Sequence, residues 1–195
     1  MNDNRTLLEI ANTALATIGA KPISSFNDAD SDASVSCAQL IKNCIEQAQS
    51  ATDWQELKKT ALLVPTGKFD EYRGHEYNAP SDMLRVISVE GGYTLWETQG
   101  NKIYIHEEAP VKICYIRYSE NPSEWSVHLR TLVVEILAAN LVGPIKGEWG
   151  ARYQMLAHIQ DEVLPACVAS NSNASPGDNF YKKTNGSYGN PYRKY

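Results

Sequence analysis

The chain has 195 residues, and 43% of them are hydrophobic, which suits one domain with a sizeable core. The formal net charge of −5 argues against a general nucleic-acid coat, which would be basic. The charge is uneven, because residues 170–195 carry four basic residues against one Asp, a balance of +3 that leaves −8 for the rest. An acidic body with a basic, aromatic end suggests that this end docks on a partner.

The four cysteines do not suggest a disulfide framework. Cys37 and Cys44 lie about two turns apart on one expected helix, which is too far for a disulfide. No CxxC pair is present, so we expect no zinc ribbon. The sequence predicts free, reduced and mostly buried thiols in a reducing compartment. The N-terminus also lacks the basic and then apolar pattern of a signal peptide, so we expect synthesis and first folding in a cytoplasm.

Two helices are expected in residues 1–55. The first runs from about Leu7 to Ile18 and begins with a capping box of Thr6 and Glu9. An acidic loop follows, whose alternating Asp residues lack the glycine and the closing Glu of a calcium loop. The second helix is expected over residues 33–51, with Trp54 as an anchor at its exit. We predict that the two helices pack as an antiparallel pair.

From Lys59 onward the hydrophobic period becomes that of short strands. Strand-like runs cover Thr60–Val64, Met83–Val89, Thr94–Glu97, Lys102–His106 and Val111–Tyr118. Gly100-Asn101 fits a two-residue hairpin turn, whereas residues 68–80 are expected to form a loop. We predict a small antiparallel sheet of four or five strands within residues 56–120, inserted between two helical halves.

The most apolar stretch runs from Pro122 to Gly143, within the third expected unit, residues 121–169. Its apolar residues recur at helical spacing, with Ser123 expected to cap the start and Pro144 to help stop the helix. Because the stretch contains Glu135 and is short for a bilayer, we predict a core helix or a subunit-interface helix and no membrane span. A second helix is expected over residues 146–168, kinked or ended by Pro165.

The last segment, residues 170–195, is rich in Asn, Ser, Gly and Pro and cannot form a core alone. A solvated linker has little use for the five aromatic residues in it. We therefore predict a partner-docking tail, although an ordinary disordered terminus is the alternative. The predicted docking residues are Phe180, Tyr181, Lys182, Lys183, Tyr188, Tyr192, Arg193 and Tyr195.

The chain carries no sequence motif of an enzyme. The phosphate-loop, GxGxxG, HExxH and GxSxG patterns are absent, and the four histidines are scattered. We predict no catalytic residues, no cofactor and no metal site. Three acidic pairs could serve a glycosidase, although we interpret them as solvated charges: Glu107-Glu108, Asp161-Glu162, and Asp53 with Glu56.

Three basic residues on the expected strands allow a second interpretation. With the tyrosines nearby they could form a nucleic-acid-reading face, but the wet face of a half-exposed sheet is favoured. These residues are Arg85, Lys112 and Arg117.

In order and spacing, residues 7–168 resemble the tail tubular protein A family, the head-to-tail adaptors of short-tailed bacteriophages. The matching stretches are LLEIANTALATIGAKPISSFNDADSDASVSCAQLIKNCIEQAQSATDW, YNAPSDMLRVISVEG, GNKIYIH and NPSEWSVHLRTLVVEILAANLVGPIKGEWGARYQMLAHIQDEV. The resemblance implies a helical bundle with an inserted β-sheet. Our own element order predicts the same α+β, mainly α fold, with two N-terminal helices, two C-terminal helices, a small antiparallel sheet and an extended tail.

The resemblance implies a structural role in the virion tail. Members form a ring, typically of twelve copies, between the capsid portal and the tail nozzle. The implied partners are the portal protein, a nozzle protein similar to tubular protein B, and further copies of the chain. Genome DNA passes through the channel without sequence-specific binding, and an acidic wall would repel its phosphates. Assembly is expected in the host cytoplasm.

We expect the apolar helix to supply the contact between subunits, divided between the core of its own chain and the neighbour. Arg130 and Glu135 are expected at the edge between those two faces. The alternative function is a cell-wall (peptidoglycan) hydrolase acting during infection through surface carboxylates. The expected interface residues are Trp125, Leu132, Val133, Ile136 and Leu137.

Overall fold

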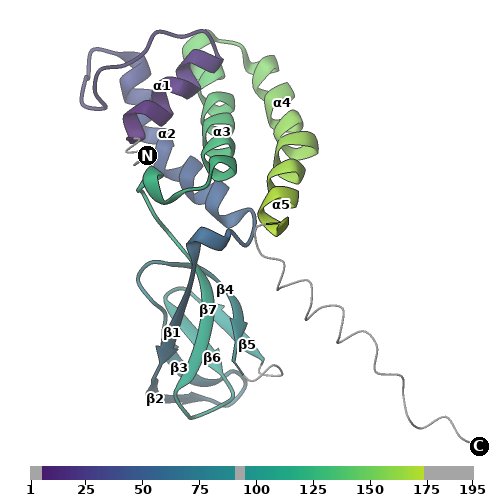
Figure 1. Cartoon of the computed structure of the whole chain (residues 1–195). Coiled ribbons are helices and arrows are strands. Elements are labelled where there is room, and N and C mark those ends of the chain that lie inside the picture. The colour runs from purple at the N-terminus through teal and green to yellow at the C-terminus, as the bar shows by residue number, and fades with distance from the viewer. Residues whose placement is uncertain (1–5, 91–94, 174–195) are drawn as a thin grey trace, which may run out of the picture.

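Two hydrophobic cores, one helical and one built from strands, lie end to end in this chain (Figure 1). The computed structural model describes residues 6–90 and 95–173. Helices account for 49% and strands for 24%, so the α+β prediction is confirmed. We call residues 58–117 the β-lobe, the helices before and after it the helical body, and the linking segments 51–57 and 118–126 the neck.

The helical body begins with α1 (Leu7–Thr17) and α2 (Asp32–Ser50). The predicted capping box is confirmed, because Thr6 Oγ1 accepts from the Glu9 N–H at 3.3 Å and the Thr6 N–H donates to Glu9 Oε2 at 2.8 Å. Each of the two helices packs mainly on α3, which the prediction of a pair packed on each other missed.

The central helix α3 (Val127–Lys146) follows a 3-10 turn, η2 (Pro122–Glu124). Its cap is Ser126, whose Oγ accepts from the Leu129 N–H at 3.2 Å, so the predicted cap at Ser123 is wrong. The predicted stop at Pro144 is also wrong. In the last turn a proline removes only one backbone bond, and the helix continues to Gly147, which adopts φ 74°.

The helix α3 is 20 residues long, so its length alone does not rule out a membrane span. In the part of the chain that is described, α3 is the one helix long and apolar enough for such a span. However, 56% of its apolar window is buried inside the chain, and core helices pass the same test. The length and composition are therefore weak evidence for a membrane.

The last helical run consists of α4 (Trp149–His158), the π-helical turn η3 (Ile159–Val163) and α5 (Leu164–Asn173). Pro165 does not end this run. The Leu164 N–H bonds to the Ile159 carbonyl five residues back, and this wider turn just before Pro165 accommodates a residue that has no N–H to donate. Ile159 is buried in the helical core, where η3 packs against α3.

Outside the undescribed residues 91–94, the β-lobe has seven strands in two sheets, not one sheet of four or five strands. A three-stranded sheet has the order β1-β7-β4, and a four-stranded sheet has the order β2-β3-β6-β5, with all pairs antiparallel. The strands are β1 (Lys58–Leu63), β2 (Pro65–Asp70), β3 (Gly74–Asn78), β4 (Met83–Val89), β5 (Trp96–Gln99), β6 (Lys102–Ile105) and β7 (Val111–Arg117).

Strand β3 and the second half of β2 occupy residues that the sequence predicts as a loop. Their polar side chains conceal the alternation, because on these two strands Tyr77 alone is both apolar and fully buried. The predicted hairpin turn at Gly100-Asn101 is confirmed by the pairing of Gln99 with Lys102. The inner faces of both sheets share one core, which includes Tyr77, Ile103 and Ile113.

Candidate functional site

Metal binding and thiol chemistry each require particular side chains in a particular setting. In residues 6–90 and 95–173, no three His, Cys, Asp or Glu side chains gather as metal ligands would. The cysteines there are free, as predicted, and Cys37, Cys44 and Cys167 are buried. Burial raises the pKa of the Cys37 and Cys44 thiols to about 11, so neither thiol is ionised near neutral pH.

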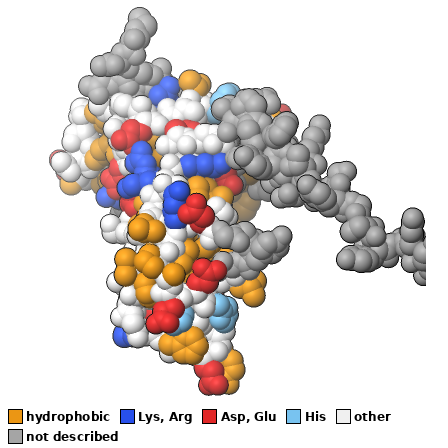
Figure 2. All heavy atoms as spheres, turned by 60° about the horizontal axis from the view of Figure 1, so that its bottom comes forward, with side chains coloured by type: hydrophobic (Ala, Val, Ile, Leu, Met, Phe, Trp, Pro, Cys, Tyr) orange, Lys and Arg blue, Asp and Glu red, His pale blue; other side chains and the backbone are white. Residues whose placement is uncertain are grey.

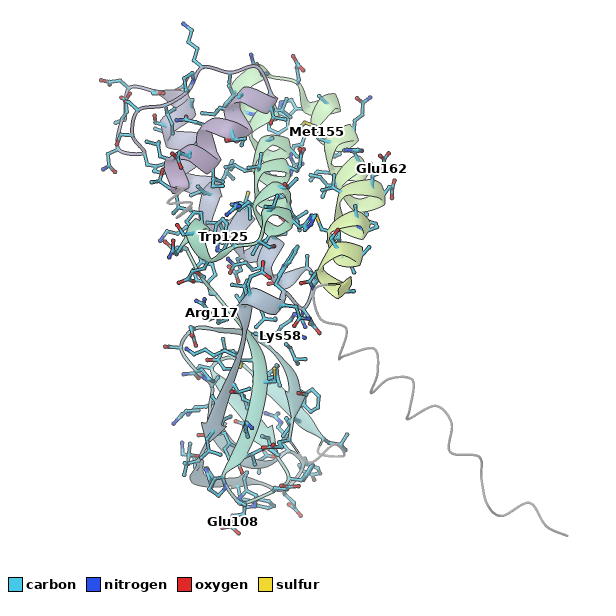
Figure 3. All side chains as sticks on the ribbon, viewed as in Figure 1. Lys58, Glu108, Arg117, Trp125, Met155 and Glu162 are labelled. Atoms are coloured by element: carbon cyan, nitrogen blue, oxygen red, sulfur yellow. The ribbon has the colours of Figure 1, made fainter. Side chains whose placement is uncertain are left out.

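The three acidic pairs lie far from one another or have structural roles. Glu108 is at the tip of the β-lobe and Glu162 is on the helical body, so those two pairs lie at opposite ends of the molecule (Figure 3). Asp53 pairs with Arg85, and Glu56 Oε1 accepts the Ser126 N–H at 2.8 Å. The third pair therefore ties chain segments together at the neck.

The basic residues of the suspected nucleic-acid face all pair with acids. Arg85 pairs with Asp53, Lys112 Nζ lies 3.6 Å from Glu90 Oε1, and one Arg117 Nη lies 2.7 Å from Glu124 Oε2. A phosphate would have to displace these carboxylates. This arrangement agrees with the wet sheet face that the sequence favours.

The neck is a hydrogen-bonded joint between the lobes. Gln49, fully buried at the end of α2, donates to the Ser119 carbonyl at 2.7 Å and accepts the Ser119 N–H at 3.0 Å. This amide pair satisfies two backbone groups inside the joint, which would otherwise be costly to bury. Ser119 Oγ also donates to Glu124 Oε2 at 2.7 Å.

The end of α5 is also tied to the neck. Asn171 is buried, its side-chain amide donates to the Asp53 carbonyl at 2.9 Å, and its oxygen accepts the Gln55 N–H at 3.2 Å. Asp53 in turn pairs with Arg85 of β4. One short segment therefore connects the last described helix with the β-lobe.

Carboxyl groups with lowered pKa lie in the β-lobe and the neck. The hydrogen bond from Lys59 Nζ at 2.8 Å, helped by the Tyr115 hydroxyl at 3.0 Å, holds the pKa of Asp82 below its usual value. At the neck, the Ser119 hydroxyl and then Arg117 lower the pKa of Glu124. These charged hydrogen bonds link neighbouring strands and turns.

The interface residues expected on α3 need a correction. All five are buried in the core of their own chain and are at most 3% exposed, so they offer a neighbouring subunit almost no surface. The helix is surrounded by α1, α2, α4 and α5, which the sequence could not reveal. The five residues are Trp125, Leu132, Val133, Ile136 and Leu137.

The partly exposed part of α3 faces a groove beside α1, with a volume of about 300 Å³. Arg130 and Glu135, which we expected at the edge of the core face, do line it, together with Ile10 and Val134. Arg130 donates to the Trp125 carbonyl at 3.1 Å, and this hydrogen bond to the neck fixes the orientation of its guanidinium. Three threonines, Thr13, Thr17 and Thr131, also line the groove, and its lining residues include no cluster of reactive groups.

Among the residues that the structure describes, the β-lobe carries most of the large apolar side chains that face solvent. Six of the ten exposed ones lie there, and Figure 2 shows hydrophobic side chains over this lobe. Exposed apolar surface of this kind marks interaction sites. Sequence analysis did not single these residues out: Leu62, Val64, Phe69, Tyr72, Leu95 and Trp96.

The predicted docking tail lies almost entirely outside the described residues. Its eight predicted contact residues, Phe180 to Tyr195, all fall within 174–195, so they remain a prediction.

A scan of protein-family models and a search of curated proteins found no match for this chain.

Proposed function

We propose that this chain is a structural adaptor of a short-tailed bacteriophage, which forms a ring between the capsid portal and the tail nozzle. The observation that carries the proposal is the element order: two helices, an inserted β-lobe and a closing helical half. The adaptor family that the sequence resembles has the same order, and its helical bundle is the arrangement we propose for the helical body.

The two-lobed form supports this role. A connector must bind different partners at its two ends, and this chain has a helical end and a β end joined by a hydrogen-bonded neck (Figure 1). Each lobe has a core of its own, so a partner can press on one lobe without needing to rebuild the other. The portal and a nozzle protein similar to tubular protein B are the proposed partners.

Charge also supports the role. The chain without its last 26 residues carries −8, and a ring of twelve such bodies repels the phosphates of DNA that passes through its channel. DNA therefore slides through without sequence-specific binding. The basic segment 170–195, with its aromatic residues, is the proposed contact with the portal. In this proposal the protein assembles in the host cytoplasm, ends in the virion tail, and needs neither a membrane nor a catalytic step.

Electron microscopy of the full-length chain, mixed with the portal protein of the same phage, tests the adaptor role. We expect rings stacked on portals. Cleavage of peptidoglycan by the unassembled chain, lost on Glu→Gln changes at the acidic pairs, would instead favour the hydrolase alternative.

A truncated chain ending at Asn173 tests the tail separately. We expect it to keep the circular dichroism spectrum and unfolding midpoint of the full chain and to lose portal binding. A matched full-length variant, in which the five tail aromatics become serine, keeps the chain length and is expected to lose binding as well. Undiminished binding by both variants would show that portal docking lies elsewhere.

A further inference from the structure

The four-stranded sheet of the β-lobe has two edge strands, β2 and β5. In the described part of the chain each of them pairs with a single strand, β2 with β3 and β5 with β6. Edge strands present backbone N–H and C=O groups that can pair with another chain. Because the order β2-β3-β6-β5 is antiparallel throughout, β5 runs opposite to β2. A second copy placed with its β2 beside β5 would continue the antiparallel alternation.

The inner face of this sheet shows where such a neighbour fits. One row of directly paired residues crosses this sheet from β2 to β5 and consists of Phe69, His75, Ile105 and Trp96. Ile105 is buried, but Phe69 is 63% exposed and Trp96 is 42% exposed. Ile105 belongs to the core that the two sheets share, whereas Phe69 and Trp96, the two ends of the row, lie outside that core.

The outer face carries complementary charges at the same level. Side chains alternate between faces along a strand, so Glu97, next to Trp96, lies on the outer face, where its partner is Tyr104. Lys68 precedes Phe69 and acts electrostatically on Glu76, which pairs with Tyr104 from the other side, so its charge lies on the same face. Lys68 and Glu97 are both exposed, and the Glu97 side chain is 57% exposed even though it lies 3.8 Å from Arg73. One edge therefore presents an aromatic ring and a cation, and the other edge presents an aromatic ring and an anion.

We propose that β2 of one copy pairs antiparallel with β5 of the next, so that the four-stranded sheets join head to tail across subunits. In one register Phe69 faces Trp96 and Lys68 faces Glu97. Antiparallel pairing requires this combination, because a step back along one strand matches a step forward along the other. Cross-strand aromatic and opposite-charge pairs are both stabilising.

The contact uses two different surfaces of the same chain, so it is heterologous and generates a ring or a filament, not a two-fold dimer. It rests on the proposed ring-forming role and assigns the contact to the β-lobe instead of α3. The contact is short, because Pro65 and a register shift before Phe69 break the regular edge of β2. These features also protect the edge from indiscriminate pairing.

A mixing experiment with the full-length chain tests the register. Lys68→Cys and Glu97→Cys are made as separate variants and oxidised alone and as an equal mixture. We expect disulfide-linked dimers in the mixture well above the level of either variant alone, because facing residues of paired strands lie within disulfide range. Glu148→Cys, exposed at the start of α4 on the helical body, replaces either partner as the control and is expected to give the background level. A mixture no more linked than the single variants would overturn the proposal.

A charge exchange gives a second measurement. Lys68→Glu or Glu97→Lys alone is expected to weaken self-association about fivefold in analytical ultracentrifugation, and the double variant is expected to restore it. A double variant as weak as the single ones would contradict the register.

The portal assay separates this inference from the adaptor role. Mixed disulfides without rings on portals would leave the sheet contact standing and remove the adaptor role. Rings on portals in which the two cysteine variants never cross-link would keep the adaptor role and refute the sheet contact.

Discussion

The helical body and the β-lobe differ in how far they bury their large apolar side chains. In the body, half of the residues of α3 are buried, and the helix packs against four other helical segments. In the lobe, aromatic side chains remain at both edges of the four-stranded sheet. A helix satisfies its backbone bonds internally, whereas a sheet leaves donors and acceptors at its edges. The body is thus suited to stability and the lobe to association.

The largest effect is expected from Trp54→Ala, at the base of the helical core. Trp54 is fully buried, and its indole N–H donates to the Ala48 carbonyl at 2.9 Å. Loss of such a side chain costs about 3–5 kcal/mol of unfolding free energy. Trp54→Phe, which keeps most of the volume, should cost much less. Chemical denaturation followed by circular dichroism measures both, and equal losses would mean that packing is not the main contribution of Trp54.

Ile103→Ala tests whether the two cores are separate. Ile103 is fully buried in the β-lobe core, and the change should cost about 2–5 kcal/mol, with Ile103→Val near 1 kcal/mol. Hydrogen exchange should accelerate in β3, β6 and β7, while α2 and α3 keep their protection. Equal acceleration in both lobes would show that they unfold as one unit.

Gln49→Ala tests the joint between the lobes. The change leaves the buried N–H and C=O of Ser119 without their partner, which costs about 1–3 kcal/mol. Gln47→Ala, exposed on the same helix, is the matched control and should change stability little. If the two variants unfold at the same denaturant concentration, the amide pair contributes nothing to stability.

Gly143→Ala should have a smaller effect, confined to the helical body. A Cβ at this position would lie 2.7 Å from Trp149 Cε3, so either the exposed Trp149 side chain or α4 itself must move away from α3. We expect a loss of about 1 kcal/mol after the better helix propensity of Ala is counted. Gly150→Ala has open space around it and should instead stabilise α4 slightly. Thermal unfolding of the two variants would contradict this if the shifts had the same sign.

The smallest effect is expected from Asp82→Asn, on the way in which stability depends on acid pH. The pKa of Asp82 is lower in the folded chain than in the unfolded chain, mainly through its hydrogen bond from Lys59, so its stabilising contribution is complete above the unfolded value near 3.9. That contribution is lost as the pH falls from there through the folded pKa. Asp82→Asn should therefore flatten the acid limb of the stability curve. An identical acid limb in the variant would rule out this assignment.

The features predicted correctly are those determined by neighbouring residues. The Thr6–Glu9 capping box and the Gly100-Asn101 turn each involve side chains within a few positions of one another. The neck was missed because its partners are distant in sequence: Gln49 bonds Ser119 at a separation of 70 residues, and Asn171 bonds Asp53 at 118. Strands β2 and β3 were missed because their exposed polar faces hide the period.

The candidate site shows the same division between local and distant information. The apolar sequence of α3 correctly indicated burial, but it could not tell a neighbouring helix from a neighbouring subunit. The exposed aromatic residues gave no signal in the sequence either. Phe69 and Trp96 are 27 positions apart, and they belong to the same cross-strand row only because four strands pair between them.

The position of the β-lobe within the chain sets an order of events during synthesis. The helical core draws mainly on residues up to Leu57 and from Ile116 onward, and Lys58 pairs with Ile116 where the lobe joins the neck. Closing a flexible loop of about 60 residues costs on the order of 4 kcal/mol of chain entropy. Pairing of β1 with β7 closes this loop, so no further loop-closure entropy is lost when α3 packs beside α1 and α2. We therefore expect the β-lobe of the nascent chain to fold first. The helices α1 and α2 can pack in the helical core only after α3 has left the ribosome.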